Sequence, residues 1–166
     1  MSNESLDQVP PFNSGKTWEE MTVGSTFRTA SRTVTETDLV NFVSLAGFNE
    51  PLFYDANHAA EGGYSGRLVP GALTYALAEG LVIQSHMLHG TGLAFMHMEL
   101  DVRAPVFVGD TITVVVEVTE ARPSSRGGRG VVTARNTVYN QRGDPVLVFT
   151  PVRLIRGRDF VPVTED

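Results

Sequence analysis

The chain has 166 residues, a hydrophobic fraction of 42% and a formal net charge of −6 at pH 7, which predict a single acidic globular domain. This charge argues against nucleic acid and an anionic membrane surface as partners, because both require a clustered basic face. Without cysteine the chain forms no disulfides, and its four histidines lack metal-ligand spacing, so no metal is predicted. No apolar run predicts a membrane span and no signal-peptide pattern is present, so a cytoplasmic location is expected.

The N-terminal residues differ in composition from the rest of the chain. Residues 1–16 are polar and contain two prolines, so we expect a flexible leader there and a single domain over residues 17–160. The first element of that domain is predicted at residues 26–35, where threonine is frequent and polar and apolar residues alternate, as is typical of a strand.

Two helical segments are predicted next. The first is capped by Thr35 or Thr37, carries an apolar stripe, and ends at Gly47, which tolerates a left-handed conformation. The second is a short helical piece within residues 55–63, ended by a pair of glycines.

The longest predicted helix covers residues 72–88 and is apolar on nearly all sides, so we expect its neighbours to bury it on more than one side. Four strands are predicted after it: 93–103, 111–122, 129–141 and 145–156. One strand, a buried helix and an antiparallel four-stranded meander predict an α+β hotdog fold, with the sheet curled around the central helix. Such a sheet has open edges, and a homodimer or an assembly of dimers would cover one of them.

Four segments of the chain resemble the MaoC-like dehydratases, a hotdog family that includes the (R)-specific enoyl-CoA hydratases. They are TWEEMTVGSTF (17–27), LVNFVSLAGFNEPLFYD (39–55), GRLVPGALTYALAEGL (66–81) and APVFVGDTITVVVEV (104–118). The second segment is similar to the family's signature loop, S-G-D-x-N-P-x-H-x-D. The resemblance covers roughly residues 17–156 and implies an acyl-CoA thioester as substrate, with coenzyme A as part of the substrate and no separate cofactor.

The signature loop keeps the family's framework but departs from it at the two catalytic positions. Laid over the loop without gaps, the framework Gly, Pro and Asp fall on Gly47, Pro51 and Asp55. The family's catalytic Asp falls on Phe48, and its catalytic His falls on Phe53. Phenylalanine transfers no proton, so the family's usual hydration mechanism does not carry over to this chain.

Three residues are the candidates for chemistry. Glu50 leads, because a carboxylate in an apolar pocket becomes a stronger base; its alternative is an exposed loop residue beside a proline. Asp55 is either catalytic or the N-cap of the short helix that follows. By resemblance, Gly71 at the start of the long helix offers its backbone N–H to the thioester carbonyl; otherwise it is a glycine required for close packing.

The remaining candidates concern binding and a third activity. The expected substrate-binding residues are Phe48, Asn49, Phe53, Tyr54 and Pro70. Glu79 either leads thioester hydrolysis, as a carboxylate on this helix does in some hotdog thioesterases, or forms a salt bridge at a dimer interface or an exposed helix end. The arginines around residues 122–129 either bind coenzyme A phosphates or form a solvated hairpin.

The predicted function is therefore an acyl-CoA hydratase or dehydratase with a non-standard active site that uses Glu50 or Asp55. The alternative is a non-catalytic acyl-CoA-binding or partner subunit whose Phe48 and Phe53 only line an apolar tunnel. A titratable group at the thioester position favours the enzyme, and a pocket without one favours the binding subunit.

Overall fold

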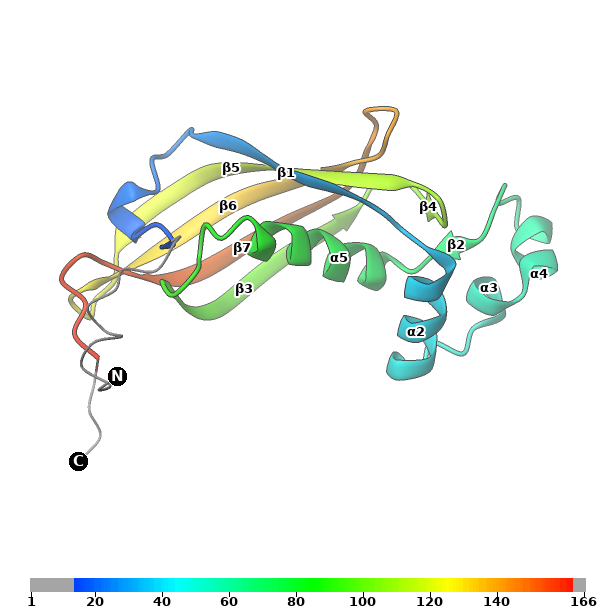
Figure 1. The fold of residues 1–166 in the computed structure, drawn as a ribbon, viewed down its shortest axis with the longest axis horizontal. Helices are drawn as coiled ribbons and strands as arrows, with labels where there is room; N and C mark the ends of the chain where they lie inside the picture. Colours follow the sequence, from blue (N-terminus) through cyan, green and yellow to red (C-terminus); the bar gives the residue numbers. More distant parts are fainter. Residues whose placement is uncertain (1–13, 163–166) are drawn as a thin grey trace, which may run out of the picture.

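The computed structural model describes residues 14–162, and Figure 1 shows one helix lying along a face of a curved antiparallel sheet. The elements in chain order are η1 (Trp18–Glu20), β1 (Thr26–Thr33), α2 (Glu36–Ala46), α3 (Pro51–Tyr54), α4 (Ala56–Glu61), β2 (Leu68–Val69), α5 (Gly71–Gln84), β3 (Gly92–Val102), β4 (Val106–Phe107), β5 (Thr111–Pro123), β6 (Arg129–Tyr139) and β7 (Pro145–Arg156). The predicted α+β hotdog fold is confirmed, with α5 as the central helix.

The strands form because β-branched residues alternate between the two faces of the sheet. In β5 the side chains of Ile112, Val114 and Val116 are almost fully buried against α5, while the residues between them face the other side. All five strands of the main sheet lie close to their predicted ranges. The core therefore lies between the concave face of the sheet and α5.

The predicted four-stranded meander is wrong at one strand. The order in the sheet is β1-β5-β6-β7-β3, so β3 pairs with β7 and not with β5. Residues 103–110 do not form a tight hairpin; they carry β4, which pairs with β2 at the start of α5. This connection takes the chain from one edge of the sheet towards the other, and it leaves β3 at an edge.

Helix α5 is shorter and more exposed than predicted. It ends at Gln84 instead of reaching residue 88, because the Ser85 hydroxyl donates to the Val82 carbonyl and His86 adopts a left-handed φ of 61°. One face of α5, which includes Ala76 and Ile83, is exposed beside β3. A single chain therefore does not bury the helix on every side.

Helix α2 begins with a capping box. Of the two predicted caps, Thr35 is the one used: its hydroxyl accepts from the Asp38 amide, and the Asp38 carboxylate accepts from the Thr35 amide at 2.9 Å. Arg32 donates to the same carboxylate at 2.6 Å. Gly47 ends the helix at φ 69°, as predicted.

We expect Asp38→Asn to lower the free energy of unfolding by about 1 kcal/mol at neutral pH, with the loss disappearing in acid. Burial alone would raise the pKa of Asp38, but hydrogen bonds from Thr35 and the charge of Arg32 outweigh it and leave the pKa below its usual value. A lowered folded-state pKa stabilises the fold above about pH 4, and this contribution is lost as the pH falls further. Urea titrations of both proteins between neutral pH and pH 3 test this, and a difference that grows in acid would contradict it.

The predicted leader lies mainly at residues 1–13, outside the described residues. Its last part is attached to the domain, since the amides of Gly15 and Lys16 donate to the carbonyls of His89 and Met87 at 2.8 Å each. Within residues 14–162, no helix combines the length and the apolar character that a membrane span requires.

Candidate functional site

A cavity of about 350 Å³ lies at the start of α5, at the end of the sheet where α2, α3 and α4 gather (Figure 1). Apart from one threonine, one tyrosine and one arginine, the residues around it are glycine or carry apolar side chains. They come from six parts of the chain and are Phe53, Tyr64, Leu68, Val69, Gly71, Thr74, Val102, Arg103, Ala104, Pro105, Val106, Val146 and Leu147. A cavity of this size and character is typical of a small-molecule site.

The first turn of α5 lies against this cavity and has no side-chain cap. Pro70 is the N-cap and no side chain caps the helix, so the first-turn N–H groups receive no side-chain acceptor. Gly71 follows and lies on the cavity wall. A Cβ at Gly71 would lie 3.1 Å from a methyl carbon of Val102, so close packing also favours glycine here. Both predicted reasons for Gly71 are compatible with this geometry.

Three phenylalanines form a row from α2 to the cavity. The rings of Phe42 and Phe48 have centroids 5.1 Å apart, and those of Phe48 and Phe53 are 6.1 Å apart. Only Phe53 lines the cavity, while Phe48 packs against the core behind it. The residue that falls on the family's catalytic histidine is thus on the cavity wall, and the one that falls on its catalytic aspartate is adjacent.

The other predicted residues of the loop do not line the cavity. Asn49, Glu50 and Tyr54 are exposed and none of them lines it. Glu50 precedes α3 as its N-cap residue, but its side chain makes no capping hydrogen bond. The apolar surroundings expected for Glu50 are therefore absent from this conformation, and its catalytic role stays a prediction.

Asp55 takes the structural role that was its alternative. It caps α4, and its carboxylate Oδ1 accepts from the amides of Asn57 at 2.9 Å and His58 at 3.4 Å. Its carboxylate is thus engaged in the structure of the helix start. Asp55 does not line the cavity either.

The sequence analysis missed the polar residues of the cavity wall. Tyr64 lies in the loop before β2, with its ring 6.4 Å from that of Phe107, and Arg103 follows β3 and pairs with Asp101 at 2.6 Å. Thr74 donates to the Pro70 carbonyl at 3.3 Å. Tyr64 and Arg103 are the only titratable side chains on this wall among the described residues.

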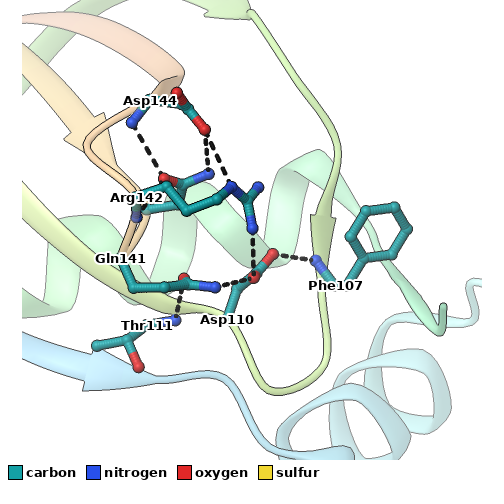
Figure 2. A network of polar contacts seen from close by, with 7 residues as sticks. Phe107, Asp110, Thr111, Gln141, Arg142 and Asp144 are labelled. Carbon is teal, nitrogen blue, oxygen red and sulfur yellow. Dashed lines mark hydrogen bonds and ion pairs between the residues drawn. The ribbon is translucent and has the colours of Figure 1, made fainter. Parts of the chain in front are cut away.

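A polar network fixes the part of the wall that follows β3, and Figure 2 shows it. Asp110 is buried and accepts from the Phe107 amide at 2.9 Å and from the Gln141 side chain at 2.7 Å. Gln141 in turn accepts from the Thr111 amide at 3.0 Å, and Arg142 bridges towards Asp144 at 3.1 Å. The turn after β4 is thereby attached to the turn between β6 and β7, which holds residues 104–106 against the cavity.

Glu79 forms a salt bridge within the chain. It pairs with Arg153 of β7, and the Arg153 guanidinium lies 5.4 Å above the ring of Phe95 on β3. The second carboxylate oxygen of Glu79 is buried without a hydrogen-bond partner in residues 14–162. Burial raises the pKa of the neighbouring Tyr75, and the Glu79 charge raises it further. Glu79 is absent from the cavity wall, so its position gives no support to a role in hydrolysis there.

Comparisons with known proteins agree on one family. Residues 21–149 match the family described as FAS1-like, dehydratase domain region. The chain is 30% identical over 112 residues to 3-hydroxybutyryl-CoA dehydratase of Methylorubrum extorquens, covering 68% of this chain and 69% of that protein. It is 31% identical over 106 residues to the (R)-specific enoyl-CoA hydratase of Aeromonas caviae, covering 64% and 75%.

A solved structure extends the likeness to nearly the whole chain. The monoamine oxidase regulatory protein of Archaeoglobus fulgidus superposes with a TM-score of 0.81 at 31% identity, covering 90% of this chain and 98% of that one. The sequence resemblance is thus matched by the arrangement of the elements. The chain belongs to the MaoC-like dehydratase and (R)-specific enoyl-CoA hydratase family.

Proposed function

We propose that this chain binds an acyl-CoA thioester in the cavity at the start of α5 and that it lacks the acid–base pair of a complete hydratase. The observation that carries this proposal is the composition of the wall: no carboxylate or imidazole lines the cavity within residues 14–162. Phe53, on which the family's histidine falls when the signature loop is laid over this chain without gaps, lines the cavity instead. The apolar walls suit an acyl chain, and the Gly71 amide suits a thioester carbonyl.

Hydration of an enoyl thioester requires two proton transfers. A base removes a proton from water, and an acid delivers a proton to the α-carbon. Of the two titratable side chains on the wall, Arg103 stays protonated and is paired with Asp101. Tyr64 alone cannot supply both the base and the acid that the two proton transfers require. The cavity therefore supplies binding groups without a proton-transfer pair.

A second candidate function is hydration or dehydration by Glu50 or Asp55. The names of the two relatives favour it, since both are enzymes that act on acyl-CoA thioesters. It requires the loop at residues 48–55 to turn one of these carboxylates into the cavity, which for Asp55 means breaking its hydrogen bonds to the start of α4. The two functions differ in what Glu50→Gln does to turnover.

We expect the purified protein to bind crotonyl-CoA while hydrating it at least about 100-fold more slowly than a typical enzyme rate on the order of 10 per second. Calorimetry measures the binding, and the loss of enoyl-thioester absorbance measures the rate. Ala104→Trp, which places a large side chain at the cavity, should weaken binding by about tenfold or more. Ala60→Trp puts the same change on the exposed side of α4 and should leave binding unchanged.

A typical enzyme rate on crotonyl-CoA that falls by about 100-fold or more in Glu50→Gln would establish the second candidate instead. Binding that Ala104→Trp does not weaken would exclude this cavity as the thioester site.

A further inference from the structure

A second hollow, of about 400 Å³, lies on the sheet face opposite α5, at the other end of the strands from the thioester cavity. Its rim comes from the hairpin between β5 and β6: Arg122, Ser124, Ser125, Arg126 and Arg129. The strand register shows on which face of the sheet the hollow lies. Arg122 and Leu154 both pair with Val131, so these three side chains point to the same face. The next residue, Val132, points to the opposite face and packs in the core. This hollow therefore opens away from the helix and shares no lining residue with the first cavity.

The charge of this region contrasts with that of the chain. Residues 120–130 and 156–160 hold five arginines and two carboxylates, while the whole chain carries a net charge of −6. Glu120 pairs with Arg122 at 2.8 Å, but Arg126 and Arg129 have no carboxylate within ion-pair distance in the described part of the chain. This concentration of positive charge would attract an anion.

The backbone of the hairpin and the side chain of Arg129 are held by several contacts. The Ser124 amide donates to the Arg129 carbonyl at 2.9 Å, and the Gly157 amide donates to the Gly128 carbonyl at 2.7 Å. Gly128 has a φ of 69°, and a Cβ there would lie 2.7 Å from the Asp159 carbonyl oxygen. Across from the hairpin, the guanidinium of Arg129 lies 5.2 Å from the centre of the Phe160 ring. These contacts reduce the ordering that a bound ligand would have to impose.

The floor of the hollow is apolar. Met96 of β3, Val131 of β6 and Leu154 of β7 form it beneath the polar rim. Arginine donates two parallel hydrogen bonds to a phosphate, serine hydroxyls add further donors, and an apolar floor accommodates a flat ring. An inorganic anion would use only the rim, whereas a nucleotide would use both the rim and the floor.

We propose that this hollow binds the phosphate-bearing end of a nucleotide. The nucleotide is either free or the adenosine 3′,5′-bisphosphate part of coenzyme A, and only the second source rests on the proposed thioester-binding function. Arg126 and Arg129 bind the phosphates, Ser124 and Ser125 complete their hydrogen bonds, and the base lies on the floor formed by Met96 and Leu154.

The test compares Arg126→Gln/Arg129→Gln with Arg28→Gln/Arg135→Gln, a control that removes the same charge from other positions on β1 and β6. The probes are adenosine 3′,5′-bisphosphate, coenzyme A, inorganic pyrophosphate and crotonyl-pantetheine, which lacks the nucleotide. In the first variant, we expect the affinity for the bisphosphate to fall by about tenfold for each arginine removed. In the control, we expect this affinity to fall by no more than about twofold.

The outcomes separate the two proposals. Binding of both the bisphosphate and coenzyme A, weakened only by the hairpin variant, supports the hollow and identifies coenzyme A as a source. Bisphosphate binding with the same arginine dependence, but no dependence for coenzyme A, supports a free nucleotide. Pyrophosphate binding as tight as the bisphosphate, no bisphosphate binding, or equal loss in both variants overturns the inference. If crotonyl-pantetheine does not bind, only the proposal that the first cavity binds a thioester is contradicted, and the nucleotide proposal is unaffected.

Discussion

The double substitution Phe48→Asp, Phe53→His is expected to give this chain measurable hydration of a short enoyl-CoA, at least about 100-fold above the unaltered protein. The two side chains would stand at the positions where the family's catalytic pair falls on this sequence. Phe53 already lines the cavity, so an imidazole there would reach a bound thioester. The rings of Phe48 and Phe53 lie 6.1 Å apart, a separation that leaves room for one water between the smaller replacements.

Activity would appear because the rest of the site is in place. Gly71 lies on the cavity wall at the start of α5 without a side-chain cap, and its proposed role as amide donor does not depend on the two phenylalanines. The network around Asp110 is likewise untouched by the substitutions. A positioned acid or base contributes roughly 10²–10⁴-fold, and the two act on different protons of the same reaction. Stability should fall by about 1–3 kcal/mol for each buried polar group that lacks arranged partners. Thermal unfolding of both proteins measures that loss.

The matched control exchanges the two new residues: Phe48→His, Phe53→Asp. It has the same composition and the same expected loss of stability, but it puts the carboxylate on the cavity wall and the imidazole behind it. We expect this control to show less activity than the first variant, because the proton-transfer groups then face the wrong atoms. Equal activity in the two variants, or none in a folded first variant, would show that the two phenylalanines do not occupy the family's catalytic positions in space.

Local patterns predicted those parts of the fold that depend on local physics. Alternating β-branched residues identified β5, and the capping threonine and terminal glycine bounded α2. The pairing of β3 with β7 was missed because both candidate neighbours of β3 are equally apolar strands. The end of α5 was missed because Ser85 and His86 stop the helix through side-chain and backbone conformations that apolar content does not report.

The site was predicted only where one segment determines it. Phe53 and Gly71 were identified from the loop and the helix start, and the structure brings both to the cavity. Tyr64 and Arg103 were missed because the pairing of β2 with β4 brings their segments to the cavity, although those segments are far apart in the sequence. Glu50 was expected in an apolar pocket, but the direction of its side chain depends on how α3 packs, which the sequence of the loop does not specify.

The exposed edge of the sheet leads to the last prediction, a homodimer formed through β3 and α5. Strand β3 ends the sheet and pairs only with β7 among the described residues. Of the ten large apolar side chains exposed in residues 14–162, Phe95, Leu100 and Val102 are on β3 outside the second hollow, and Ile83 is on α5. Apolar residues gathered on an open strand edge are typical of an interface, since a long exposed edge otherwise promotes aggregation.

We expect the double substitution Ile83→Asp/Leu100→Asp to convert a dimer at micromolar concentration into a folded monomer. The dissociation constant of the dimer should rise by at least about 100-fold. Ile83 is 51% exposed and Leu100 is 40% exposed in the single chain, so a carboxylate at either position is tolerated in the monomer but is buried unpaired in the dimer. Val40→Asp/Leu45→Asp makes the same change on α2, where the two side chains are 49% and 89% exposed, and should leave the dimer intact. Sedimentation velocity distinguishes the species, and circular dichroism confirms that each variant is folded. An unaltered chain that sediments as a monomer at micromolar concentration would contradict the homodimer. A dimer that the α2 substitutions disrupt as strongly as the edge substitutions would show that β3 does not form the interface. In either case the apolar side chains of β3 would require a different chain to cover them.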